Sequence, residues 1–326
     1  MIPVETIDKL EQCYRSISEF CAGLSESDWK TPTQLPGWTV QDNLSHMASW
    51  EGEMSGRPLT EHRAADLSNA KNPIGEENEH EVDMRRPWPG ANVLAEWEDV
   101  VAERVRILRS ADEAYFAQVS DGPTGPAPLS DYFHIRVLDL WTHEQDMRRA
   151  LGRPGHRSGP AAEHTIDRLI RTVPVVIGKR AATPEGQTVV LEITGAVVRT
   201  VAVTITEGRG QISSTAPADA MCTITMDSDV FLQLATGRGN ATELAGQCSI
   251  GGDTAHAMKV LTNMREFIEK NCDNVGGRFA EEARKIHYGE SAPRNIYGRA
   301  TGEEAEALKD EGIEFGELPW PVRGDA

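Results

Sequence analysis

The sequence lacks the features that mark several large classes of protein. It has no apolar run of about 18 residues, the length that a membrane-spanning helix needs, and its start, MIPVETIDKLEQ, lacks the basic beginning and apolar core of a signal peptide. Lysine and arginine number 33 against 51 aspartates and glutamates, which gives a formal net charge of −18. Because nonspecific binding to nucleic acid or to an anionic membrane needs basic patches, we expect neither partner, and we expect a cytoplasmic protein.

Cysteine is scarce and irregularly spaced. The chain has five cysteines and no CxxC pair. Such an odd, scattered set fits reduced thiols in a cytosolic protein better than a disulfide framework or a zinc ribbon. No histidine partner for a nucleophilic cysteine is identifiable from the sequence, so we expect packing to be the main role of these thiols. The five are Cys13, Cys21, Cys222, Cys248 and Cys272.

The N-terminal part of the chain has the periodicity of helices. At 326 residues, with 39% hydrophobic residues, the chain is long enough for two domains with separate cores. Apolar residues recur at helical spacing in four stretches, which predicts a four-helix bundle. The polar stretch between the second and third helices is interpreted as a long loop that either forms one wall of a site or is simply solvated. The four helical stretches are 4–24, 39–54, 91–110 and 130–151.

After GRPGHRSGP, a linker rich in glycine and proline, the sequence pattern changes from helical to a mixture of helices and strands. A helix at about 161–179 is expected first, and then four segments of alternating, β-branched residues, which predict strands. Two further helical segments follow, DSDVFLQLATG and GDTAHAMKVLTNMREFIEK. The expected strands are TVVLEITG, AVVRTVAVTITEG, GQISST and MCTITMDS.

These patterns predict the fold class and the boundaries of the domains. We expect an α-helical bundle domain at 1–155 and an α+β domain at 156–272. Residues 273–326 form an extension of unknown role, with a short helix in TGEEAEALKDEG. Its apolar end, IEFGELPWPV, is expected to dock on its own chain, because such a segment is poorly suited to solvent.

Two of the helical segments expected in the bundle carry histidine, LPGWTVQDNLSHMASWE and RVLDLWTHEQDMRRALG. Residues advance by about 100° per position in a helix, so Asp139, His143 and Asp146 share one face of the second segment. A carboxylate and an imidazole four residues apart can bind one ion from a single rigid helix, and Asp146 is a candidate to orient His143. His46, beside the apolar stripe of the first segment, could reach inward. If the segments meet, His46, Asp139 and His143 form a two-histidine, one-carboxylate site.

The same residues also admit an ordinary structural explanation. A lone histidine near an apolar stripe is more often a hydrogen-bonded core or surface residue than a ligand. A carboxylate four residues before a histidine is a common helix ion pair, and Arg136, one turn before Asp139, fits an ion pair equally well. The run from His143 to Met147 does not complete HExxH, so a zincin protease is disfavoured.

At these residues the sequence resembles the DinB-like, mycothiol-dependent enzymes related to maleylpyruvate isomerase. The resemblance rests on LPGWTVQDNLSHM and, more specifically, on DLWTHEQDMRRALGRPGH. It implies an antiparallel four-helix domain with a divalent ion, usually zinc, held by a histidine of the second helix and a carboxylate-x-x-x-histidine pair of the last. Those roles fall on His46, Asp139 and His143. Many relatives have glutamate where Asp139 stands, so direct and water-mediated binding of the metal by this shorter side chain both stay open.

The resemblance extends to the second domain. The strand order and the segment SIGGDTAHAMKVL are similar to the sterol-carrier-like domain that accompanies the bundle in this family. In relatives an arginine in a TGR segment of this domain is thought to face the site. In this chain ATGRGN supplies Arg238. An arginine after a helix-ending glycine is otherwise often solvent-exposed.

The function implied by the resemblance is that of a metal-dependent, mycothiol-dependent transferase or isomerase. A metal-bound thiol is deprotonated and can attack a small electrophile, with mycothiol as the expected cosubstrate. Such a site also leaves a position for water, so a metal-dependent hydrolase stays open, as does a noncatalytic carrier of an apolar ligand. A monomer or a homodimer is expected. The candidate residues are Arg238 and Asp146 for catalysis and Arg136, Trp50 and Asn78 for cosubstrate binding.

Overall fold

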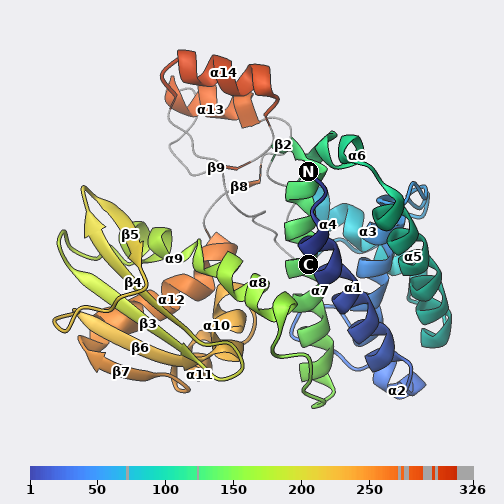
Figure 1. Ribbon diagram of the computed structural model, residues 1–326, viewed down its shortest axis with the longest axis horizontal. Helices are drawn as coiled ribbons and strands as arrows, with labels where there is room; N and C mark the ends of the chain where they lie inside the picture. The colour runs from blue at the N-terminus through green and yellow to red at the C-terminus, as the bar shows by residue number, and fades with distance from the viewer. Residues whose placement is uncertain are drawn as a thin grey trace. The chain divides into compact units, whose positions relative to one another are not determined.

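The computed structural model describes residues 1–70, 73–122, 125–270, 273–274, 279–288, 296–297 and 300–313. The chain divides into two compact units (Figure 1). One comprises residues 1–155 together with 272–326, and the other comprises residues 156–271. In the described part of the chain, no helix combines the length and apolar character that crossing a membrane would take.

Four long helices form the first unit and run side by side (Figure 1). Each packs against two others, so that α1 and α3 are each flanked by α5 and α7. Their interior is filled by apolar side chains at helical spacing, among them Leu10, Leu44, Trp97 and Phe133. This confirms the four-helix bundle expected from periodicity. The helices are α1 (Val4–Cys21), α3 (Val40–Glu53), α5 (Gly90–Ser110) and α7 (Leu129–Ala150).

The start of α3 is fixed by a reciprocal cap. The side chain of Thr39 accepts a hydrogen bond from the backbone N–H of Asp42, at 3.3 Å. The carboxylate of Asp42 in turn accepts one from the backbone N–H of Thr39, at 2.7 Å. The Thr39 hydroxyl and the Asp42 carboxylate thus accept hydrogen bonds from backbone N–H groups that a helix end otherwise leaves without partners. The cap sets the register of α3 and so the direction in which His46 points.

The stretch expected to be a loop between α3 and α5 contains a further helix, α4 (Pro73–Arg85), so that expectation was wrong there. Its inner face is held largely by ion pairs. Arg85 binds Glu81 one turn earlier, at 2.9 Å, and Glu96 of α5, at 2.7 Å. Among the residues of this helix whose burial is described, Val82 is the only buried hydrophobic one. Because charged residues occupy its buried positions, α4 has no apolar stripe from which periodicity could predict it.

Short elements complete the first unit. Helix α2 (Glu26–Trp29) precedes α3, and α6 (Glu113–Ala117) follows α5. Strands β1 (Val119–Gly122) and β2 (Gly125–Pro128) pair as an antiparallel hairpin before α7.

The second unit is a five-stranded sheet with helices, as expected for an α+β domain. The strand order is β5-β4-β3-β6-β7, and all neighbours are antiparallel except β3 and β6, which are parallel. Helices α10 and α12 pack against the sheet at β6 (Figure 1). The two elements that the sequence did not predict are the short α11 and β7. The strands are β3 (Thr188–Thr194), β4 (Arg199–Thr206), β5 (Arg209–Ser213), β6 (Cys222–Asp227) and β7 (Ser249–Gly252). The helices are α8 (Pro160–Ile170), α9 (Val173–Val175), the π-helix η1 (Val176–Arg180), α10 (Ser228–Ala235), α11 (Ala241–Ala245) and α12 (Thr254–Lys270).

The C-terminal extension contains two described helices that pack on each other. The predicted helix is α14 (Gly302–Asp310), and α13 (Phe279–His287) was not predicted. Arg284 of α13 binds the carboxylate of Glu311, at 2.7 Å. Two short strands, β8 (Asp273–Asn274) and β9 (Ile296–Tyr297), pair in parallel. The apolar end expected to dock on its own chain falls, from residue 314 onward, outside the described residues.

Candidate metal centre

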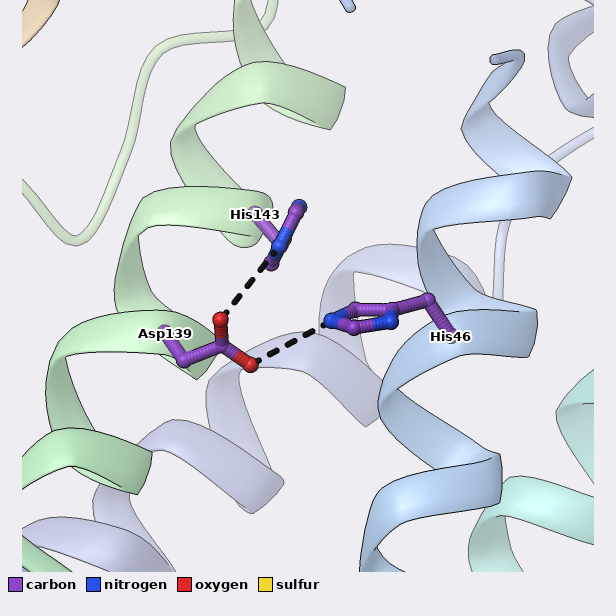
Figure 2. Close-up of side chains that lie close together, drawn as sticks. All are labelled: His46, Asp139 and His143. Carbon is purple, nitrogen blue, oxygen red and sulfur yellow. Dashed lines mark ion pairs between the residues drawn. The ribbon is translucent and has the colours of Figure 1, made fainter. Parts of the chain in front are cut away.

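Two helices bring the predicted metal ligands together. Figure 2 shows His46 of α3 pointing at Asp139 and His143 of α7. His46 Nε2 lies 3.4 Å from Asp139 Oδ2, and His143 Nε2 lies 3.6 Å from Asp139 Oδ1. One donor atom from each of the three side chains lies within 4.8 Å of the others. Within the described ranges, no other group of three histidine, cysteine or acidic side chains gathers in this way.

The geometry fits a divalent ion. Zinc bound tetrahedrally at about 2.0–2.2 Å from nitrogen and oxygen ligands places neighbouring ligand atoms about 3.4 Å apart. The histidine nitrogens lie 3.4 and 3.6 Å from Asp139, each from a different oxygen of its carboxylate. His143 Nε2 is buried and has no hydrogen-bond partner among the described residues. A buried nitrogen left without a partner is costly, and a metal ion would satisfy it. Assignment of the three residues as ligands nevertheless stays a prediction, as does zinc.

Asn43 determines how the His143 ring is presented. His143 Nδ1 lies 2.8 Å from the side-chain oxygen of Asn43, which comes from α3. An oxygen acceptor fixes the proton on Nδ1 and leaves the Nε2 lone pair for an ion. Asp146, which was expected to orient this ring, lies farther away, with Oδ2 at 3.8 Å from Nδ1, and is paired with Arg149. A catalytic role for Asp146 stays a prediction.

Aromatic packing shields the cluster from solvent. The rings of His46 and His143 lie 4.7 Å apart, centroid to centroid, and Trp38 packs on both, at 5.2 and 6.0 Å. Trp38 is itself fixed by donating its indole N–H to Glu79 of α4, at 3.1 Å. None of the three candidate ligand residues is more than 4% exposed. A dry, rigid surrounding of this kind strengthens the interaction of an ion with its ligands.

Arg136 ties Asp139 to a second carboxylate. It donates from Nη1 to Asp139 Oδ2, at 2.6 Å, and from Nε to Glu51 of α3, at 2.9 Å. Burial lowers the pKa of the guanidinium, but the charges of Asp139 and Glu51 outweigh burial, and the net shift of the Arg136 pKa is upward. Arg136 is therefore a permanent cation beside the candidate ligands. The structure places it in the ion pair that the sequence allowed as the alternative to ligand binding.

The other residues expected to bind the cosubstrate lie next to Arg136. Its guanidinium stacks over the indole ring of Trp50, at 5.8 Å from the centroid. Trp50 donates its indole N–H to the side-chain oxygen of Asn78, at 2.8 Å. Asn78 thus lies on helix α4, and not on a loop as expected. The three residues form one contiguous cluster, and their binding of a cosubstrate stays a prediction.

Arg238, the other expected catalytic residue, belongs to the second unit. It follows α10 and is buried, at 4% exposure, with Nη1 donating to the backbone oxygen of Thr236 at 2.8 Å. It is therefore not the solvent-exposed arginine that the sequence allowed as an alternative. Contact with a substrate stays a prediction for Arg238.

None of the described cysteines is suited to act as a nucleophile. Burial raises the pKa of Cys13, helped by the charges of Glu144 and Glu51, and burial also raises the pKa of Cys21. Burial raises the pKa of Cys222 and of Cys248 to about 11. Only a thiolate is an effective nucleophile, so these thiols are inert at neutral pH. Cys272 lies outside the described residues.

Three residues of the site were missed from the sequence. Asn43 precedes His46 by three positions on α3, and Glu51 follows it by five. Arg104 lies on α5 and donates from Nε to Glu51, at 3.2 Å. A charged residue at an otherwise apolar helix position was the available signal, and it applies to Glu51 and to Arg104. Their partners lie on other helices and could not be inferred from spacing.

Two families match the chain. Residues 10–148 match the mycothiol maleylpyruvate isomerase N-terminal domain, and residues 206–323 match a protein of unknown function, DUF1178. The second match spans part of the sheet unit and most of the C-terminal extension. No curated protein matches the chain.

Several solved structures are remotely similar. A crystal structure of the mycothiol-dependent maleylpyruvate isomerase is 16% identical over 77% of this chain and 93% of its own, with a TM-score of 0.48. The sterol carrier protein domain 2 of Helicoverpa armigera is 16% identical over 33% of this chain and 92% of its own, with a TM-score of 0.26. Sterol carrier protein 2 from Yarrowia lipolytica is 18% identical over 32% of this chain and 91% of its own, with a TM-score of 0.24.

The family match covers the candidate metal centre. Residues 10–148 span all of α3 and reach the last turn of α7, and so include His46, Asp139 and His143. The match confirms the resemblance seen in LPGWTVQDNLSHM and in DLWTHEQDMRRALGRPGH, of which it covers DLWTHEQDMR, and it supports an enzyme of this kind. Over residues 10–148, the helical unit of this chain therefore matches the mycothiol maleylpyruvate isomerase N-terminal domain family.

Proposed function

We propose that this protein is a metal-dependent enzyme that uses mycothiol, or a similar small thiol, to act on a small electrophile in the cytoplasm. The reaction is an isomerisation like that of maleylpyruvate or the transfer of the thiol to the substrate. The observation that carries the proposal is the buried cluster of His46, Asp139 and His143, in which His143 Nε2 has no hydrogen-bond partner among the described residues.

The residues around the cluster prepare it for an ion. Two imidazoles and one carboxylate leave part of a coordination sphere open, as catalytic sites do. The side-chain oxygen of Asn43 orients the His143 ring, and Arg136 donates a hydrogen bond to the carboxylate of Asp139. A divalent ion bound there would hold the sulfur of an external thiol as a thiolate at neutral pH. The inert thiols of the four described cysteines agree with a nucleophile that comes from outside.

The thiol chemistry balances without a further reactant. On an alkene conjugated to a carbonyl group, the thiolate sulfur forms a C–S bond to one alkene carbon, and the alkene electron pair moves toward the carbonyl oxygen. The former double bond is then a single bond and can rotate. Loss of the thiolate breaks the C–S bond and returns the alkene with its geometry changed, which is an isomerisation. Uptake of a proton on the neighbouring carbon instead gives the S-conjugate, which is a transfer.

The test begins with metal content and thiol binding. The protein is purified without an affinity tag, its metal is measured by mass spectrometry, and mycothiol is titrated calorimetrically into the wild type and His143→Ala. We expect one metal ion per chain in the wild type and loss of both metal and thiol binding in the variant, because one imidazole is a large part of the donor set. His134→Ala is the matched control, since His134 lies on the same helix outside the cluster and is within 3.5 Å of Thr6. It should retain both.

Turnover then separates the alternatives. Maleylpyruvate and simple conjugated alkenes are incubated with the loaded enzyme with and without mycothiol. Consumption that requires the thiol supports the proposal. Metal binding with activity that needs no thiol would favour a hydrolase in which water is the nucleophile. Absence of metal from the wild type would refute the proposal and leave a noncatalytic carrier of an apolar ligand as the better description.

A further inference from the structure

Glu51 is the centre of a buried charge network that joins all four long helices. Its carboxylate accepts the hydroxyl of Tyr14 of α1, at 2.6 Å, Nε of Arg104 of α5, at 3.2 Å, and Nε of Arg136 of α7, at 2.9 Å. Glu51 and both arginines are fully buried, at 0% exposure. Three donors on one carboxylate satisfy most of its acceptor capacity. Glu51 is thereby fixed more firmly than an ordinary ion-pair partner.

The network ends at the metal centre through Arg136. While Nε of Arg136 is held by Glu51, Nη1 donates to Asp139 Oδ2, at 2.6 Å. The stacking of the guanidinium over Trp50, at 5.8 Å, removes a further degree of freedom. The position of Glu51 therefore determines where the cation of Arg136 stands relative to the carboxylate of Asp139.

The charges in this network cancel before any ion is bound. Arg104 and Arg136 contribute two positive charges, and Glu51 and Asp139 contribute two negative charges. If Glu51 were neutral, the two arginines would face Asp139 alone, and the place where a divalent ion would bind would carry an excess positive charge. In a buried site such an imbalance is felt strongly, because the surroundings screen it poorly.

Stability alone does not explain this arrangement. Burying four charges is costly, and replacing buried ion networks by apolar residues is often neutral or stabilising. A bundle of this size could fill the same space with leucine or methionine, as it does elsewhere in its core at Leu44 and Met47. The network therefore calls for a role beyond packing, and its contact with Asp139 indicates which one.

We propose that Glu51 is a positioning residue for the metal centre: by neutralising and holding Arg136, it leaves the charge of Asp139 available to the ion. The inference rests on the proposed function, because it requires that the cluster bind a metal. Glu51 itself does not touch the ion or a substrate in this account. It acts through Arg136.

The experiment compares metal affinity in two buried-glutamate variants of the full chain. Glu51→Gln keeps the size of the side chain and removes its charge. We expect zinc affinity, measured by competition with a chromophoric chelator, to fall about 10–100-fold, the usual effect of losing a residue that supports a metal ligand. The matched control is Glu144→Gln, since Glu144 is equally buried and binds Arg148, at 2.7 Å, and Ser16, at 2.6 Å. It should retain the wild-type affinity.

A double variant separates charge from structure. Glu51→Gln combined with Arg104→Met removes one negative and one positive charge and restores the balance. We expect it to recover metal affinity relative to Glu51→Gln alone, although it removes more of the network. The visible absorption of the Co²⁺-loaded proteins is measured in parallel, because it reports the coordination of the ion. A variant that only folds less well would show the wild-type spectrum in the fraction of protein that is loaded.

The outcomes distinguish this inference from the proposed function. Weakened zinc binding in Glu51→Gln with recovery in the double variant supports the inference. Equal zinc affinity in the wild type and Glu51→Gln overturns it and leaves the metal site intact, as does a double variant that binds zinc no better than Glu51→Gln. A wild type that binds no zinc or Co²⁺ overturns both.

Discussion

The helical unit and the sheet unit differ in the kind of side chain that they bury. In the helical unit the buried residues include Glu51, Arg104, Arg136 and Asp139. Glu51 pairs with Arg104 and Arg136 across helices, and Arg136 pairs with Asp139 within α7. Among the described residues of the sheet unit, Arg238 is the only charged residue that is buried. A core that only needs to hold a fold can be apolar, as the sheet shows. Packing alone does not explain the charged interior of the helical unit.

The largest effect that would test this contrast is expected from Arg136→Met. The variant leaves Asp139 without its 2.6 Å donor in a buried position, and breaking a buried pair typically costs about 3–5 kcal/mol. The remaining charges sum to minus one, so zinc at one fixed concentration should stabilise the variant more than it stabilises the wild type, because a tighter site gains more free energy at the same zinc concentration. Chemical unfolding with and without zinc measures both. Arg148→Met, which removes the ion pair to Glu144, serves as the control and should gain no more from zinc than the wild type does.

A comparable loss of stability should arise from Ile224→Ala in the sheet unit, but without any effect on the metal. Ile224 lies in β6, between β3 and β7, and is fully buried. Truncating such a side chain costs about 2–5 kcal/mol. Zinc affinity of the folded variant should equal that of the wild type, because no charge changes. A parallel loss of zinc affinity would contradict the separation of the two interiors.

The smallest effect is expected from Asn43→Leu. The substitution removes the oxygen that lies 2.8 Å from His143 Nδ1 but preserves the helix and approximates the side-chain volume. Loss of such support typically lowers metal affinity about 10–100-fold, or about 1.4–2.7 kcal/mol. Asn43→Asp retains an oxygen acceptor and should bind zinc more tightly than Asn43→Leu. Chelator competition on the three proteins measures the difference, and identical affinities would show that Asn43 does not orient the ring.

The sequence predicted the elements whose signal is local. The four long helices followed from the spacing of apolar residues, and the shared face of Asp139 and His143 followed from their separation by one helical turn. Helix α4 was missed because ion pairs such as that of Arg85 with Glu96 take the place of an apolar stripe. The limits of the domains, at 155 and 272, stay a prediction.

The supporting residues of the site depend on contacts between helices. Glu51 lies 85 positions from Arg136, and Asn43 lies 100 positions from His143. No spacing rule connects residues that far apart, so the polar residues were visible in the sequence but their partners were not. Helix spacing proposed the three candidate ligands, the resemblance to the family supported them, and the structure added the residues that hold them.

The burial of the candidate ligands has a kinetic consequence. His46 and His143 are at most 1% exposed and lie behind Trp38. An ion could enter or leave only when side chains or helix ends move aside, so exchange would follow the rate of that opening and not the strength of coordination. Metal exchange would therefore be slow, and the supply of metal during folding would favour the ion that the newly folded protein carries.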